Sequence, residues 1–148
     1  MTGFLQQLHR ELALALGDAV WAFARIEWVV HDYLRRLSND PLDELLADFN
    51  FRPRANVLRR LIQKREASQD LKKRALFAIE QAEGLADRRN IIVHNPWRIW
   101  IDLDAREFMH EIRKYSNPQK KVDLEQLRAF ASECELAEQA LEESLSAL

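Results

Sequence analysis

Glycine, proline and cysteine are scarce in this chain, whose 148 residues include three Gly, four Pro and one Cys. So few turn-forming residues, combined with abundant Leu, Ala, Glu and Arg, favour long helices with few connections. We therefore predict a mainly α-helical protein. Because Cys134 is the only cysteine, one chain cannot form an internal disulfide or a cysteine-based metal cluster, and we expect this residue to pack between helices.

Long apolar runs are also absent. The uninterrupted apolar stretches are far shorter than the roughly 18 residues of a membrane-spanning helix, and the first residues lack the basic segment and apolar core of a secretory signal. We expect a cytoplasmic protein with no membrane partner. With 47% hydrophobic residues the chain can bury one good core, so we expect a single domain over residues 1–148.

Neither sign of charge dominates the sequence. The 22 basic and 24 acidic residues give a net charge of -2, which argues against a uniformly basic nucleic-acid-binding protein. The charge is nevertheless uneven, because the charged residues of segment 52–74 are nine basic and two acidic, whereas those of segment 122–148 are seven acidic and one basic. Arg59, Arg60 and Lys64 in the basic segment would follow an RNA backbone if they flank a cleft, and a solvated helix surface is the alternative.

Apolar residues recur every three or four positions along four segments, as in amphipathic helices. The predicted major helices are residues 4–37, a helix beginning at Pro53, residues 71–94 with an N-cap near Ser68, and a helix capped by Asp123. Gly17 is a candidate for a kink in the first of these helices. Residues 41–49 are expected to form a short helix or an ordered connection.

The segment after Pro96 has a different pattern. Residues 97–103 alternate with period two and are rich in β-branched and aromatic side chains, and Asp104 and Ala105 can turn the chain into a partner strand. This predicts a β-hairpin over about residues 97–115, with a short helix as the alternative. The expected fold is a four-to-five-helix bundle with this hairpin before the last helix. Because four tryptophans and a hairpin exceed what such a bundle covers, we also expect a homodimer.

Two charged side chains interrupt the predicted apolar helix faces. Arg89 projects among the alanine, leucine and isoleucine side chains of the third helix, where a guanidinium group is costly unless it is paired. Glu27 interrupts the apolar face of the first helix, with His31 one turn further along. We therefore predict that Glu27 pairs with Arg88 or Arg89.

Asn90 and His94 lie four residues apart, on a face adjoining Arg89 at the end of the third helix. A histidine can transfer protons near neutral pH, and an arginine can stabilise the charge that accumulates on a phosphate during transesterification. Such a pair cleaves RNA without a metal when the ribose 2′-hydroxyl is the nucleophile. Alternatively, His94 caps the carbonyl end of its helix and Arg89 is a buried ion-pair partner.

The segment from Arg89 to His94 resembles the motif of HEPN domains, an arginine followed after four to six residues by a histidine, with a polar residue next to the arginine. The resemblance implies a four-to-five-helix bundle, usually dimeric, with two such motifs lining a shared cleft. It also implies that Arg89 and His94 form a catalytic pair supported by Asn90. Many HEPN proteins are metal-independent ribonucleases of toxin-antitoxin or defence systems, whereas others are inactive dimerisation or ligand-binding modules. The family pattern does not require the hairpin.

Two functional hypotheses follow from the sequence. The first is a homodimeric, HEPN-like endoribonuclease that needs no cofactor or metal ion, since no histidine pair or Asp/His cluster with ligand spacing appears. The second is a non-catalytic HEPN-like homodimer that binds an antitoxin, another protein or a nucleotide. In both, Glu27, Arg88 and His31 are supporting residues, and Trp97 is a candidate for stacking on an RNA base, with a role in the hairpin's apolar face as the alternative.

Overall fold

The apolar periodicity of the first segment forms a helix that runs almost the full length of the molecule, α1 (Thr2–Arg36). The structure is a computed structural model that describes residues 2–148. Helix α1 continues without interruption through Gly17, the predicted position of a kink. A Cβ atom at Gly17 would meet no other atom within 4 Å, so no neighbouring group requires a glycine or a break there.

Four further helices follow, and the mainly helical fold is confirmed. They are α2 (Leu42–Leu45), α3 (Phe51–Lys64), α4 (Gln69–His94) and α5 (Leu124–Ser146). The predicted caps are present: the Ser68 side chain accepts from the backbone N–H of Leu71, and Asp123 forms a reciprocal capping box with Gln126. Helix α3 begins at Phe51, two residues before the predicted start at Pro53. Pro53 fits in this first turn because the first N–H groups of a helix have no partner within the helix.

The predicted hairpin is also confirmed, and it belongs to a three-stranded antiparallel sheet. Its strands are β1 (Trp97–Asp102), β2 (Glu107–Arg113) and β3 (Lys121–Val122), in the order β1-β2-β3. The Asp102 side chain accepts hydrogen bonds from the backbone N–H groups of Asp104 and Ala105, both at 3.0 Å, and this closes the turn near its predicted position. The two-residue strand β3 was not predicted, because it is too short to show an alternating pattern.

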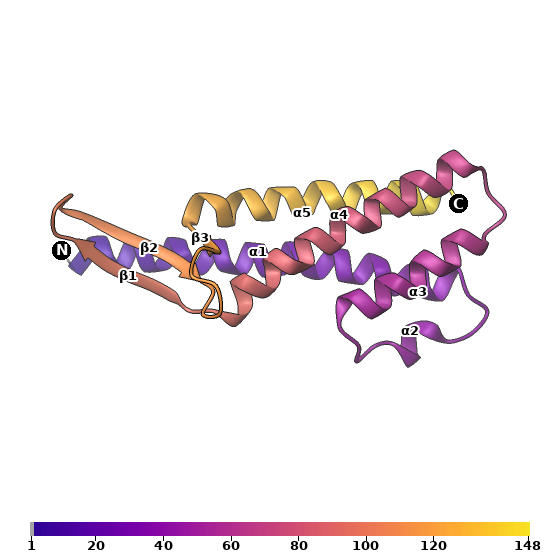
Figure 1. The fold of residues 1–148 in the computed structure, drawn as a ribbon, viewed down its shortest axis with the longest axis horizontal. Helices are drawn as coiled ribbons and strands as arrows, with labels where there is room; N and C mark the ends of the chain where they lie inside the picture. Colours follow the sequence, from indigo (N-terminus) through magenta and orange to yellow (C-terminus); the bar gives the residue numbers. More distant parts are fainter. Residues whose placement is uncertain (1) are drawn as a thin grey trace.

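Helices α1, α4 and α5 lie along the long axis of the molecule, while α2 and α3 lie at one end (Figure 1). The hairpin lies at the other end beside the beginning of α1, where the ring centroids of Phe4 and Phe108 are 5.3 Å apart. The largest fully buried side chains come from the four long helices and β2, and include Phe23, Ile26, Leu58, Ile79, Ile112, Phe130 and Leu141. Among residues 2–148, no helix is both long and apolar enough to cross a membrane.

Candidate functional site

Arg89, the charged residue on the apolar face of α4, forms an ion pair with Glu27 on α1, and Arg89 is one of the two partners predicted for Glu27. A nitrogen of the Arg89 guanidinium, Nη2, lies 3.1 Å from Oε1 of Glu27. The same carboxylate oxygen accepts from Nη2 of Arg54 on α3, at 2.9 Å, and this second partner was not predicted. Arg88 turns instead toward α5, where it pairs with Glu133. One carboxylate therefore joins three helices and leaves the cluster with excess positive charge.

This cluster of Glu27, Arg54 and Arg89 is largely withdrawn from solvent. The side chains of Glu27 and Arg89 are 23% and 27% exposed, and that of Arg54 is 11% exposed. The Arg89 guanidinium lies over the ring of Phe23, 5.2 Å from its centroid, so packing and charge hold it in the same place. Arg89 is thus positioned by α1 and does not extend freely into solvent.

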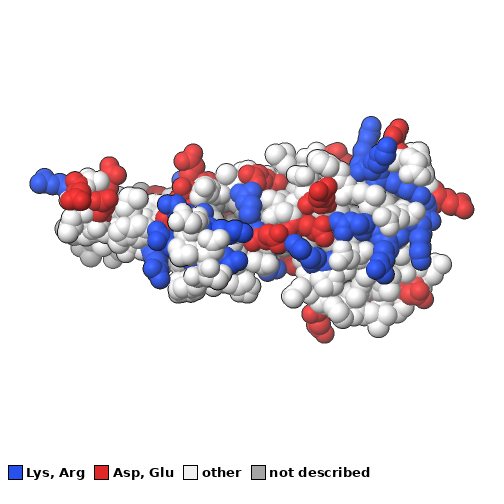
Figure 2. Space-filling view, viewed as in Figure 1, with Lys and Arg blue, Asp and Glu red and all other residues white. Residues whose placement is uncertain are grey.

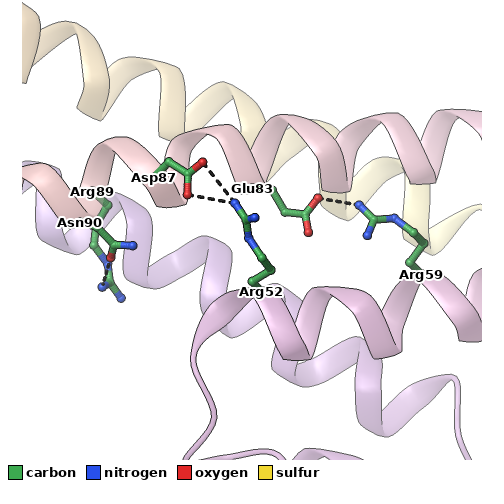
Figure 3. A network of polar contacts seen from close by, with 6 residues as sticks. All are labelled: Arg52, Arg59, Glu83, Asp87, Arg89 and Asn90. Atoms are coloured by element: carbon green, nitrogen blue, oxygen red, sulfur yellow. Dashed lines mark hydrogen bonds and ion pairs between the residues drawn. The ribbon is translucent and has the colours of Figure 1, made fainter. Parts of the chain in front are cut away.

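Arg89 also contacts Asn90, its neighbour on α4. The guanidinium donates to Oδ1 of Asn90 at 3.1 Å, which fixes that side-chain amide and leaves its NH₂ group free to donate to another molecule (Figure 3). Two ion pairs farther from the end of α4 fasten this helix to α3: Arg52 with Asp87 and Arg59 with Glu83.

An open groove of about 730 Å³ lies beside the last turns of α4. Asn90 and His94 line one wall, and both residues are exposed. The groove is also lined by the connection between β2 and β3, residues 114–120, which we call the β2–β3 loop. Its residues in the groove include Lys114, Tyr115 and Lys120, and Lys121 at the start of β3 lines the groove beside them. A histidine, an amide and several basic side chains therefore line the same groove.

Asn95, just beyond the end of α4, holds the two walls together. Its side-chain nitrogen donates to the carbonyl of Ile91 at 2.8 Å, and its Oδ1 accepts from the backbone N–H of Tyr115 at 3.2 Å. A single side chain thus closes the helix and anchors the β2–β3 loop. This fixes the loop relative to His94.

The residues predicted to act together do not all line the groove. Asn90 and His94 line it and Arg88 contributes to it, but Arg89 faces α1 and reaches the groove only through Asn90. His31 stacks on Trp28 of its own helix, with ring centroids 5.5 Å apart.

The residues proposed for RNA binding lie outside the groove. Arg59 is engaged by Glu83, and Arg60 lies beside it on α3. Lys72 donates to the carbonyl of Gln63, so Lys64 lies beside the first turn of α4, about 30 Å from His94 at about 1.5 Å per helical residue. Trp97 is half-buried and packs near His110 on the hairpin.

The basic residues of the β2–β3 loop were missed, because this irregular segment has no periodicity that predicts where its side chains lie. The signal in the sequence was a Ser-Asn-Pro turn flanked on both sides by lysines.

The fold and the groove together define a helical bundle with a polar, basic groove at the end of α4. Comparisons of the chain with protein-family models, with curated proteins and with solved structures found no match. Within residues 2–148, no group of three or more His, Cys, Asp or Glu side chains is placed to hold a metal ion.

Proposed function

We propose that this protein is a HEPN-like, metal-independent endoribonuclease that acts as a homodimer, with a role as a toxin or defence effector. One observation carries the proposal: His94 and Asn90, whose NH₂ group is free to donate, line a groove that is also lined by the lysines of residues 114–121. A phosphodiester in this groove would meet cations, a hydrogen-bond donor and a proton-transfer group together.

Three side chains have separate roles in the proposed reaction: His94, Asn90 and Arg89. His94 takes the proton from a ribose 2′-hydroxyl, whose oxygen then bonds to the neighbouring phosphorus. The bond from phosphorus to the 5′-oxygen breaks, this oxygen takes up a proton from water, and a 2′,3′-cyclic phosphate remains. The protonated His94 then returns its extra proton to solvent. Asn90 donates to a phosphate oxygen, and Arg89 positions Asn90 and adds positive charge next to the reacting group.

The exposed surface of α1 supports the homodimer. Leu14, Trp21 and Trp28 recur every seven residues, so they share one face of the helix, and each is well exposed. Gly17 and Ala24 lie between them and would allow close approach of another helix. A second copy of the chain would cover this apolar stripe.

One observation favours the alternative, a non-catalytic HEPN-like homodimer that binds an antitoxin or another protein. The Arg89 guanidinium contacts Glu27, Asn90 and Phe23 within its own chain, as expected of an arginine that braces the bundle. Under this alternative His94 has no role in turnover.

The test is cleavage of an end-labelled RNA pool in EDTA by wild type, His94→Ala and Asn90→Ala, with His9→Ala as the control at an exposed histidine on α1. We expect wild type and His9→Ala to leave 2′,3′-cyclic ends and His94→Ala to be at least about 100-fold slower. Equal cleavage by wild type and His94→Ala would contradict the proposed chemistry. No cleavage by a folded wild type would favour the interaction module.

A further inference from the structure

We propose that the β2–β3 loop is the element that binds the backbone of single-stranded RNA and holds it against His94. This inference rests on the proposed function, but it concerns binding and can fail or succeed separately from cleavage. It assigns a role to the part of the chain that the resemblance leaves unexplained, namely the sheet inserted before α5.

The fold of the loop brings two lysines together. The backbone N–H of Lys114 donates to the carbonyl of Lys120 at 2.9 Å, so the two residues lie side by side where the loop leaves and rejoins the sheet. Both line the groove that contains His94. Two neighbouring lysines that line one groove match the repeated charges of a nucleic-acid backbone.

The charge of these two lysines is available to a ligand. Across residues 2–148, neither Lys114 nor Lys120 forms an ion pair, whereas Lys121 lies 3.4 Å from Glu111. Asp87 is the one carboxylate among the groove residues, and Arg52 engages it at 3.1 Å. The groove therefore keeps a positive potential that its own acidic side chains do not cancel.

The loop is held in shape before any ligand binds. Asn117 donates from its backbone to the carbonyl of Lys114 at 3.2 Å and accepts from the backbone of Lys120 at 2.9 Å. Tyr115 is tied to the end of α4 through Asn95. A preorganised loop binds with a smaller loss of conformational entropy than a floppy one.

Tyr115 adds a surface for a base. It lines the groove, is 66% exposed and has the Arg98 guanidinium 5.8 Å from its ring centroid. An exposed aromatic ring beside unpaired cations is the arrangement by which proteins bind single strands, whose bases are free to stack. A duplex would keep its bases away from this ring, which favours single-stranded RNA.

The competing basic surface is at the far end of the molecule. Figure 2 shows Lys and Arg side chains gathered where α3 meets α4 as well as near the β2–β3 loop. The first group includes Arg60 and Lys64, which lie near the start of α4, whereas His94 lies at its end. Of these two basic surfaces, the one near the β2–β3 loop shares a groove with His94 and is placed to hold RNA where His94 would act on it.

The experiment measures binding by fluorescence anisotropy with a labelled 2′-O-methyl oligoribonucleotide, which lacks the nucleophile and stays intact. Lys114→Gln/Lys120→Gln should raise Kd about tenfold and reduce the slope of log Kd against log salt by about 1.4, the value for two lost contacts with a single strand. Tyr115→Leu should raise Kd at least about fivefold and leave that slope unchanged. The charge-matched control Arg65→Gln/Lys73→Gln, at exposed positions near the α3–α4 junction, should bind as wild type does.

The outcomes separate the two proposals. Wild type could bind the probe, lose binding in the loop variants as expected, and still not cleave unmodified RNA. That result would support the RNA-binding role of the loop and contradict the proposed nuclease activity. If wild type cleaves RNA and the loop variant binds the probe as wild type does, the RNA-binding role of the loop is wrong and the proposed nuclease activity is supported. Two other results would also contradict the RNA-binding role of the loop. One is loss of binding in Arg60→Gln/Lys64→Gln with normal binding by the loop variant, and the other is no binding by wild type.

Discussion

Replacing Glu27 with Gln tests whether one carboxylate holds the bundle together at the candidate site. The substitution keeps the size of the side chain but removes the negative charge that faces Arg54 and Arg89. Two guanidinium groups, at 2.9 and 3.1 Å from the same oxygen, would then lie close together without a counter-charge. Because these groups are mostly withdrawn from solvent, water screens their repulsion only in part.

The expected loss of stability follows from these contacts. A hydrogen bond to a charged group contributes about 1.5–3 kcal/mol, and removing one partner from a fully buried ion pair costs about 3–5 kcal/mol. Since Glu27 and Arg89 keep about a quarter of their side-chain exposure, we expect Glu27→Gln to lower the free energy of unfolding by about 2–4 kcal/mol. For a chain of this length the melting temperature should fall by about 5–15 °C.

Urea denaturation followed by far-ultraviolet circular dichroism measures this loss. The matched control is Arg52→Gln, which breaks another ion pair to α4 but at side chains 63% and 67% exposed, so it should cost less than about 1 kcal/mol. The double variant Glu27→Gln/Arg89→Gln should be about 1–2 kcal/mol more stable than the sum of the single effects, because it removes one unneutralised cation. An additive double variant, or a Glu27→Gln as mild as Arg52→Gln, would refute the reasoning.

Two further predictions concern buried titratable groups. Burial, together with the hydrogen bond to Glu142, raises the pKa of Tyr33 above its usual 10, so the stability that depends on its neutral form should be kept below pH 10 and lost as the pH rises past the raised pKa. Urea titrations from about pH 8 to about pH 11 should show a smaller loss in Tyr33→Phe than in wild type, and equal losses would contradict this cause. Burial also raises the pKa of the Cys134 thiol to about 12, so iodoacetamide should leave Cys134 unmodified in the native protein and modify it after unfolding. Mass spectrometry that finds equal rates in both states would show that the thiol is accessible.

The helices and the hairpin could be predicted because their patterns extend over many residues. The alternation in residues 97–103 identified β1, and the caps Ser68 and Asp123 located the starts of two helices. The pairing of Glu27 with Arg88 or Arg89 could be predicted because Glu27 and Arg89 each interrupt an otherwise apolar face, and the structure selects Arg89. The contact of Arg54 with Glu27 could not be predicted, since Arg54 lies in a basic segment with several arginines and no local pattern shows which of them faces α1.

The groove could be predicted only in part. Asn90 and His94 lie one turn apart on one helix, so the sequence predicts that both side chains lie on the same side of that helix. The opposite wall depends on a contact between Asn95 and Tyr115, 20 residues apart, that no local pattern encodes. For the same reason the sequence pointed to Arg59, Arg60 and Lys64 of α3 as RNA-binding residues and missed the lysines of the β2–β3 loop.

The pairing of the first helix with the last has a consequence for synthesis of the protein. Helix α1 packs along α5, and the Tyr33 hydroxyl reaches Glu142, 109 residues later in the chain. On the ribosome, the apolar face of α1 therefore remains uncovered on this side until more than 100 further residues have been synthesised, 109 of them in the case of Tyr33 and Glu142. During that interval Phe23, Ile26 and Leu34, all buried in the finished fold, are accessible to chaperones and to aggregation. Translation that stops before α5 would release a chain that lacks part of its core, so this fold is completed only after α5 has been synthesised.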